Sequence, residues 1–200
     1  MPSTTDRYLA RDVDARMLRV ITEHLADIGH VLDAGCGAGQ YGEHLAHIAG
    51  RASGMDIDPL LCATAKARSV YEHISNCAIT DAGSIGSFDA VFCSEVLEHV
   101  PNESFRAATT ALEAAADKII VITVPHPRAP HFKEDETHVL RYTVRSMARM
   151  LNESEKFAYD TFGIGFHEKF QKHPLIRIVE PISRRIAHLS PTLLFVGHRR

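Results

Sequence analysis

The chain has 200 residues, of which 45% are hydrophobic and 24% charged, and its formal net charge is −3. This length and composition predict one globular domain with its own core. The slight excess of acidic residues gives no general attraction to nucleic acid. The four cysteines form no C-x-x-C pair, which favours reduced cytosolic thiols.

Targeting signals are not evident. The first residues lack the apolar stretch of a signal peptide, and no apolar run approaches the roughly 20 residues of a membrane span. We therefore expect a cytoplasmic protein with no membrane association.

Helical and strand patterns alternate from the start of the chain to residue 124. Helices are expected at residues 8–27, 40–48, 60–68 and 102–116. Strands are expected at residues 31–32, 54–57, 71–76, 88–93 and 118–124. Such alternation favours a parallel sheet with helices on both faces, that is, an α/β fold.

The rest of the chain begins with a proline-rich loop, residues 125–137. A helix is expected at 143–152, a strand at 157–162, a helix at 174–189 and a strand at 192–196. No repeat or linker interrupts the sequence. We expect a single domain over 1–200, with an N-terminal helix (1–27), a ligand-binding core (28–124) and a substrate-side segment (125–200).

The most informative segment is Val31–Gly39, in which a short strand runs into alternating glycines and then into a helix. Gly37, Gly39 and Gly42 fit the G-x-G-x-x-G pattern of dinucleotide sites, and Asp56 follows at the expected distance. However, Asp33 would repel a pyrophosphate at this turn. A carboxylate there suits S-adenosylmethionine, which carries an ammonium and a sulfonium.

Three motifs occur here in order: Val31–Gly39, Gly54–Pro59, and Ser87–Val91 followed by Ser94–Val100. Together they resemble the class I S-adenosylmethionine-dependent methyltransferases over residues 28–124. The resemblance implies a Rossmann-like, doubly wound, seven-stranded sheet that is mostly parallel. It also implies an antiparallel last strand near 191–198.

The resemblance also implies roles for matching residues. Gly35, Gly37 and Gly39 would pass beneath the methionine part of the cofactor, with Asp33 near its amino group. Asp56 would bind both ribose hydroxyls, and Ile57 would flank the adenine. The remaining candidates for cofactor contact are Cys36, Tyr41, Asn76, Cys77 and Ser94.

Of these, Asn76 stands where the family often has an acid for the adenine amine, so its amide oxygen would accept instead. Asp81 is a possible substitute. For Tyr8 and Tyr41, packing and cofactor contact are about equally expected.

Catalytic residues are expected at the carboxyl ends of the strands, where open α/β sheets bind ligands. The candidates are Glu95 and His99 after the fourth strand, and His126 and His131 after the fifth. His126 is the preferred candidate, because it lies two residues beyond a buried strand.

A metal site is an alternative. Glu95, Glu98 and His99, with His138, resemble the metal-binding set of small-RNA 2′-O-methyltransferases, and the ligand types suit manganese or magnesium. The same residues also resemble routine parts of family members without metal. We expect no metal here.

We therefore expect a methyltransferase that moves a methyl group from S-adenosylmethionine to O or N of a small molecule and releases S-adenosylhomocysteine. A nucleic-acid substrate is not expected, and the chain would be a monomer or homodimer. The alternatives are a metal-assisted RNA 2′-O-methyltransferase, a nicotinamide dehydrogenase and a non-catalytic S-adenosylmethionine-binding protein.

Overall fold

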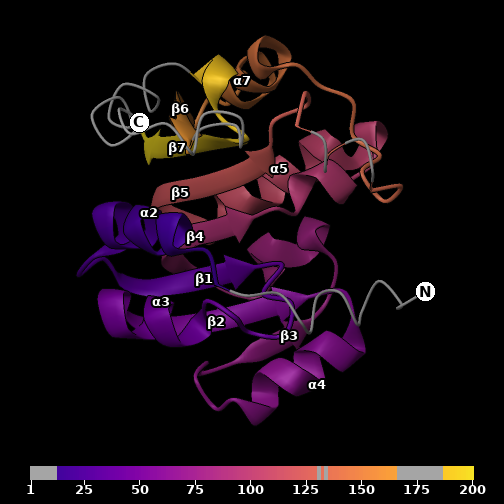
Figure 1. Cartoon of the computed structure of the whole chain (residues 1–200). Helices are drawn as coiled ribbons and strands as arrows, with labels where there is room; N and C mark the ends of the chain where they lie inside the picture. Colours follow the sequence, from indigo (N-terminus) through magenta and orange to yellow (C-terminus); the bar gives the residue numbers. More distant parts are fainter. Residues whose placement is uncertain (1–12, 130–131, 133–134, 166–186) are drawn as a thin grey trace, which may run out of the picture. The chain divides into compact units, whose positions relative to one another are not determined.

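The computed structural model describes residues 13–129, 132, 135–165 and 187–200 (Figure 1). Its helices are α2 (Ala15–Leu25), α3 (Gly42–Ala49), α4 (Pro59–Ala67), α5 (Asn102–Ala115) and α7 (Val144–Asn152), with short 3₁₀ turns η1 (Ile79–Ser84), η2 (Leu97–His99) and η3 (Ala187–Leu189). Its strands are β1 (Gly29–Ala34), β2 (Gly50–Asp56), β3 (Ile74–Asn76), β4 (Phe88–Ser94), β5 (Ala116–Pro125), β6 (Phe157–Ile164) and β7 (Thr192–Arg199).

The seven strands form one sheet in the order β3-β2-β1-β4-β5-β7-β6. β1 is parallel to both β2 and β4, and β2 is parallel to β3. β6 and β7 are antiparallel, with Phe157 opposite Arg199 and Ile164 opposite Thr192. The predicted fold class, a mostly parallel seven-stranded sheet with an antiparallel last strand, is confirmed.

The chain divides into two compact units. The first unit comprises Met1–Cys93 and Ala107–Ile120, and the second comprises Ser94–Arg106 and Val121–Arg200.

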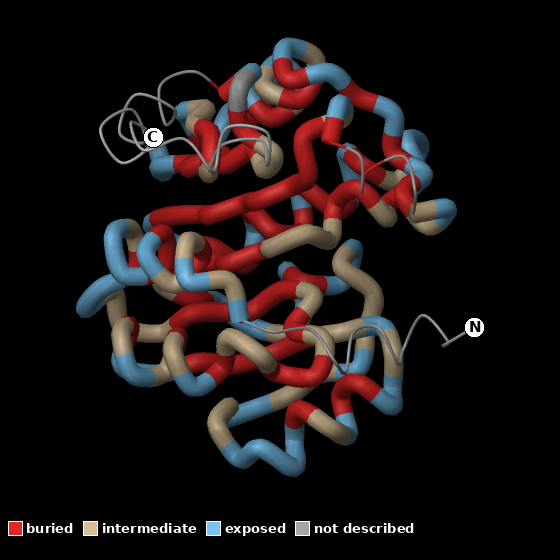
Figure 2. The backbone as a smooth tube through the Cα atoms, in the orientation of Figure 1, coloured by how far each residue is buried: buried red, intermediate tan, exposed pale blue. Residues whose placement is uncertain are grey.

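In the first unit, α3 packs against β1 and β2, while α4 packs against β2 and β3. The last four residues of β1, 31–34, and residues 52–55 of β2 are buried, and buried backbone is red in Figure 2. α2 packs against α3 through residues at helical spacing. These buried residues of α2 are Met17, Val20, Ile21 and Leu25.

The turn from β2 into α4 follows from its sequence. The Asp58 side chain accepts hydrogen bonds from the N–H groups of Leu60 and Leu61, and Pro59 occupies the first turn of α4. This cap fixes the end of β2, where Asp56 lies.

The second unit contains β6 and β7, with α7 packed against β6. α7 begins with a capping box, in which Thr143 and Ser146 each accept a hydrogen bond from the other's backbone N–H. Most of the helix expected at 174–189, and residues 8–12 of the first expected helix, lie outside the described residues.

The strand expected at 71–76 is shorter than predicted, since β3 begins only at Ile74. Ser69, with a positive φ of 57°, lies in the connection between α4 and β3. Tyr71 therefore belongs to a loop, where its side chain is free of the alternation that a strand would impose.

Candidate cofactor site and catalytic cluster

The glycine turn after β1 has a backbone that favours glycine. Gly35, Gly37 and Gly39 have φ values of 82°, 54° and 81°, in the left-handed region that side chains disfavour. The N–H groups of Gly35 and Cys36 donate to the carbonyl oxygen of Met55 at 2.8 and 2.9 Å, which ties the turn to β2.

Asp56, at the end of β2, also holds this turn. Its Oδ2 accepts from the N–H of Gly37 and its Oδ1 from the N–H of Asp58, both at 2.9 Å. A carboxylate has about four acceptor positions, so both oxygens can accept further bonds from two neighbouring hydroxyls. The next side chain, Ile57, is 72% exposed and offers an apolar surface beside Asp56.

Asn76, at the end of β3, turns its amide nitrogen toward the same loop. Nδ2 donates to the carbonyl oxygens of Asp56 and Ile57, at 3.0 and 2.9 Å. This orientation leaves Oδ1 as the acceptor of the amide, as the adenine role requires. The neighbouring Cys77 donates its N–H to the carbonyl oxygen of Asp56 at 3.1 Å.

Asp33 has a different environment, since it is only 2% exposed. Its Oδ2 accepts a hydrogen bond from the Tyr71 hydroxyl at 2.6 Å. Burial raises the pKa of Asp33 to about 7; the Tyr71 hydrogen bond lowers it, and the nearby Asp56 charge raises it. The sequence interpretation missed Tyr71, which it placed as an ordinary aromatic residue at the start of the strand expected at 71–76.

Cys36 and Tyr41 are the remaining cofactor-contact candidates in the described part of the first unit. Burial, followed by the charges of Asp33 and Asp56, raises the pKa of the Cys36 thiol, which keeps it neutral. Tyr41 lies just before α3 and contacts Phe92 edge to face, with ring centroids 5.6 Å apart. Tyr8 lies outside the described residues.

In the second unit, Ser94 and Glu95 are bonded to β5. The Ser94 Oγ lies 2.9 Å from the Thr123 Oγ1, and the Glu95 N–H donates to the Thr123 carbonyl oxygen. Glu95 has a φ of 56°, an uncommon conformation for a residue other than glycine. Backbone strain of this kind clusters at functional sites.

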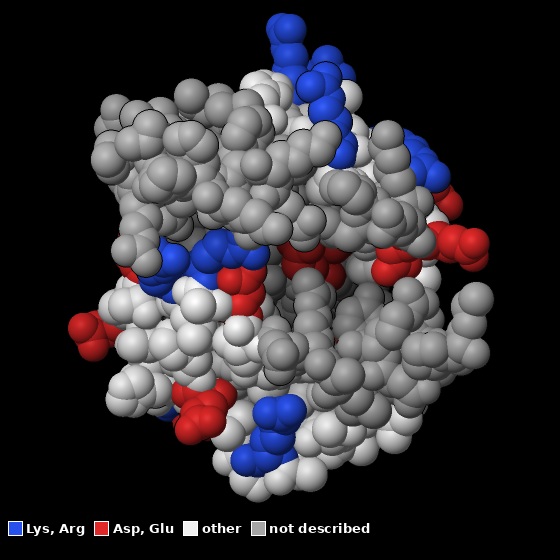
Figure 3. Space-filling view, viewed as in Figure 1, with Lys and Arg blue, Asp and Glu red and all other residues white. Residues whose placement is uncertain are grey.

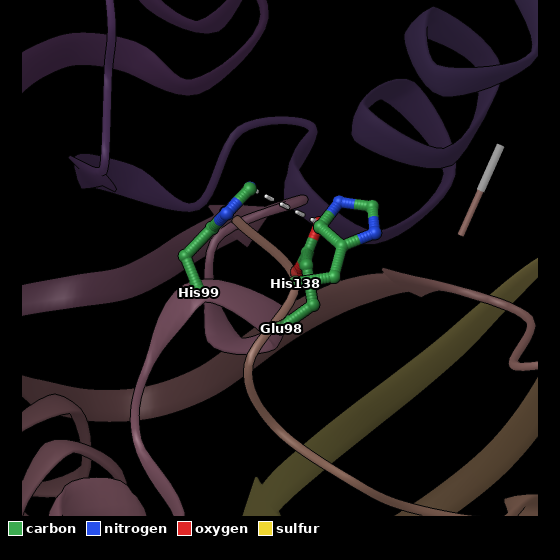
Figure 4. Close-up of side chains that lie close together, drawn as sticks. All are labelled: Glu98, His99 and His138. Atoms are coloured by element: carbon green, nitrogen blue, oxygen red, sulfur yellow. Dashed lines mark ion pairs between the residues drawn. The ribbon is translucent and has the colours of Figure 1, made fainter. Parts of the chain in front are cut away.

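Three side chains of the second unit converge: Glu98 and His99, close to Glu95 in sequence, and His138, which lies about 40 residues further along the chain (Figure 4). Each offers one ligand atom, and these atoms lie within 4.8 Å of one another. Glu98 is 1% exposed, and its Oε1 lies 3.9 Å from the Nε2 of His99. Glu95 is not in this group, although all four residues belong to the described part of the chain.

The hydrogen bonds of His99 define its tautomer. Its Nδ1 lies 3.1 Å from the carbonyl oxygen of Thr137 and 3.0 Å from the Thr137 Oγ1, whose own hydrogen goes to Asp135 at 2.6 Å. Both partners of Nδ1 are therefore acceptors, so Nδ1 carries the proton. Although burial opposes it, hydrogen bonding from Thr137 lowers the pKa of Asp135, which favours the ionised acceptor.

The tautomer of His138 is also defined by a hydrogen bond of its Nδ1. Its Nδ1 lies 2.9 Å from the carbonyl oxygen of Phe132 and must donate to it. The Phe132 ring also stacks on the imidazole at 5.1 Å. In their neutral forms, both histidines therefore carry the lone pair on Nε2, where it can accept a proton or bind a cation.

His126 has the opposite tautomer. Its Nδ1 accepts from the N–H of Arg128 at 3.1 Å, which leaves the proton of a neutral ring on Nε2. His126 is 2% exposed, and its own N–H donates to the carbonyl oxygen of Pro191. Its catalytic role stays a prediction, and this tautomer suits a donor better than a base. His131 lies outside the described residues.

Basic and acidic side chains of the described residues are interspersed on the face in Figure 3, without a continuous basic stretch. Among these residues, no helix is both long enough and apolar enough to cross a membrane.

Comparison with known proteins agrees with this geometry. Residues 32–115 match the family described as "Methyltransferase domain". A ubiquinone biosynthesis O-methyltransferase of Xanthomonas axonopodis is 32% identical over 105 residues, which are 48% of this chain and 44% of that protein. The chain thus spans less than half the length of this curated relative.

Solved structures are similar in fold. A methyltransferase from Archaeoglobus fulgidus superposes with a TM-score of 0.70 at 17% identity, covering 92% of this chain and 91% of that one. Magnesium protoporphyrin IX methyltransferase from Synechocystis superposes with a TM-score of 0.62 at 16% identity, covering 100% and 86%. The methyltransferase domain of bacterial CtHen1-C superposes with a TM-score of 0.66 at 15% identity, covering 97% of both chains.

Proposed function

We propose that this chain, a class I S-adenosylmethionine-dependent methyltransferase, transfers the methyl group of S-adenosylmethionine to an oxygen atom of a small-molecule acceptor. S-adenosylhomocysteine is the second product. In this reaction the acceptor oxygen forms a bond to the methyl carbon as the carbon–sulfur bond breaks. The sulfonium becomes a neutral thioether, and the hydroxyl proton must go to a base.

The residues around the glycine turn support the cofactor part of this proposal. The two Asp56 oxygens can accept from the two ribose hydroxyls. Exposed Ile57 offers a surface for adenine, and the amide oxygen of Asn76 can accept from the adenine amine. Buried Asp33 is a counterion for the cofactor's ammonium group.

The observation that carries the choice of oxygen is the orientation of His99. The oxygens of Thr137 accept the Nδ1 proton of His99, and Asp135 orients the Thr137 hydroxyl, so the His99 Nε2 carries the lone pair that can take a hydroxyl proton. Removal of a proton by a positioned base contributes about 10²- to 10⁴-fold to the rate. A neutral amine can attack the methyl group before it loses a proton, so it needs such a base less.

The similarity to O-methyltransferases supports the same choice. The matched segment covers less than half of each protein, so it supports the reaction type and leaves the acceptor open. The net charge of −3 favours a small molecule over RNA.

Metal assistance is the second candidate, favoured by the donor set of Glu98, His99 and His138. One carboxylate and two imidazoles suit manganese or a similar divalent ion. The Nδ1 groups of both histidines are fixed by backbone carbonyls, as in many metal-binding histidines. A cation held there would polarise the acceptor hydroxyl, as expected for a metal-assisted O-methyltransferase.

One assay separates these possibilities. The chain is incubated with methyl-labelled S-adenosylmethionine and matched pairs of acceptors, phenols and the corresponding anilines, and the products are identified by mass spectrometry. We expect methylation of the phenols. We also expect a loss of at least about a hundredfold in kcat for His99→Asn, with wild-type kcat for the exposed control His198→Asn.

The same assay after thorough chelation decides the role of a cation. Loss of activity that Mn²⁺ restores would assign the cluster to a metal, whereas unchanged activity would leave His99 as the direct base. Methylation of the anilines alone, or a fully active His99→Asn variant, would contradict the proposal.

A further inference from the structure

Tyr71 is in contact with two parts of the glycine turn. Its hydroxyl donates to Asp33 at the end of β1, 38 residues away in sequence. Its ring lies over the start of α3, where a Cβ on Gly42 would come within 2.6 Å of the Tyr71 Cζ. A Cβ on Gly39 would come within 3.1 Å of the Tyr71 Cε2.

This packing explains the third glycine of the G-x-G-x-x-G pattern. Gly42 has no positive φ, so its backbone conformation does not require glycine. It must be small because the Tyr71 ring and the Val70 side chain fill the place of its side chain. An internal packing contact therefore explains the third glycine of the dinucleotide-like pattern, whereas Gly37 and Gly39 have positive φ values.

Tyr71 is also placed to act on the charge of Asp33. Asp33 is surrounded by the apolar core of β1, and its titratable neighbours are Tyr71, Asp56 and the thiol of Cys36. Arg68, at the end of α4, acts on Tyr71. Burial and the Asp33 charge raise the pKa of the Tyr71 hydroxyl, so it stays protonated and remains a donor.

We propose that Tyr71 is a positioning residue for cofactor binding: its hydroxyl holds Asp33 in place and favours the ionised form of this carboxyl group near neutral pH, where it pairs with the ammonium group of S-adenosylmethionine. This inference rests on the proposed role of Asp33 at the cofactor. It assigns a task to a residue outside the three family motifs.

The hydrogen bond from Tyr71 to Asp33 determines the direction in which the Asp33 pKa changes when the hydroxyl is removed. A donor stabilises a carboxylate more than a neutral carboxyl group, so its loss raises the pKa of Asp33 further above its ordinary range. In Tyr71→Phe, more Asp33 is then neutral at pH 6 to 7. The attraction for a cationic ligand weakens there and recovers at higher pH.

The phenylalanine variant is the informative substitution. It keeps the ring against Gly39 and Gly42 and removes only the hydroxyl. Tyr71 also lines a cavity of about 730 Å³ together with Gly54 and His73. A smaller side chain would open Asp33 toward this cavity and change its hydration as well.

The test is isothermal calorimetry of S-adenosylmethionine binding to the wild type and Tyr71→Phe between pH 6 and 8.5. We expect the variant to bind roughly tenfold more weakly at pH 6, corresponding to about one pKa unit on Asp33, and to approach wild-type affinity at pH 8.5. The ratio of the two affinities is the readout, because titration of the cofactor's own amine cancels in it.

Asp33→Asn supplies the control, since it cannot ionise. Adding Tyr71→Phe to Asp33→Asn should leave the affinity ratio independent of pH. A pH-independent loss in Tyr71→Phe alone would mean that the residue only supports packing, and unchanged affinity at all pH values would also overturn the inference. Failure of the wild type to bind S-adenosylmethionine would instead contradict the cofactor assignment itself.

Discussion

At the scale of single residues, two carboxylates at the ends of adjacent parallel strands have different environments. Asp33 is buried and accepts from a tyrosine, whereas Asp56 is partly exposed and accepts from two backbone N–H groups. The first environment suits a buried counterion. The second suits a bidentate acceptor of neutral hydroxyl groups.

Asp56→Asn should weaken binding of S-adenosylhomocysteine by at least tenfold, since each charged hydrogen bond contributes about 1.5–3 kcal/mol. Calorimetry measures this loss. Asp58→Asn is the matched control, because asparagine also caps helices well and the neighbouring carboxylate faces α4. Equal affinity of Asp56→Asn and the wild type would contradict the ribose assignment.

At the scale of elements, helix starts and turns fix where functional side chains lie. The Asp58 cap ends the β2 turn beside Asp56, and the Thr143–Ser146 box starts α7 shortly after His138. Local hydrogen bonds thus determine where a loop ends and a regular element begins.

Thr143→Ala should lower the free energy of unfolding by about 1 kcal/mol, because it removes one half of the capping box. Urea unfolding followed by circular dichroism measures the change. Arg145→Ala, at an exposed position in the same turn, should leave the free energy of unfolding almost unchanged. Neither variant should alter the affinity for S-adenosylhomocysteine. Equal stability of Thr143→Ala and Arg145→Ala would show that the box contributes little.

At the scale of the whole molecule, buried Asp33 should make stability depend on pH. Its pKa of about 7 in the folded chain exceeds the ordinary value of 3.8, so the folded state binds this proton more tightly than the unfolded state. The contribution of Asp33 to the free energy of unfolding is therefore most favourable below about pH 4, and it decreases as the pH rises toward 7. Asp89, whose pKa is lowered by hydrogen bonding with Lys118, acts in the opposite direction at acidic pH.

The difference in unfolding free energy between Asp33→Asn and the wild type isolates the Asp33 contribution. It should grow between pH 4 and 7, in favour of the variant, by an amount on the order of a few kcal/mol. Urea titrations without cofactor at several pH values measure it. A difference that does not change with pH would show that burial does not raise the pKa of Asp33 in the folded chain.

The fold and the cofactor turn were predictable because their signals are local. Strand and helix periods, the glycines after β1 and the acid after β2 each lie within a short window of sequence. The G-x-G-x-x-G pattern was ambiguous on its own, and Asp33 had to decide between two ligands.

The amino-acid sequence alone predicted the sheet and the family resemblance, and it supplied the residues expected to bind the methyl donor. Only the tertiary structure joined Tyr71 to Asp33, brought His138 to Glu98 and His99, and defined the tautomers of His99 and His126. The physical reason is that Tyr71 and Asp33, His99 and Thr137, and His138 and Glu98 meet across 38 or more residues of chain. The contact of Arg128 with His126 spans only two residues, but it depends on the backbone conformation of the folded loop. Burial and hydrogen-bond partners, which set the charge of a carboxyl group and the protonated nitrogen of an imidazole, arise only when the chain is folded.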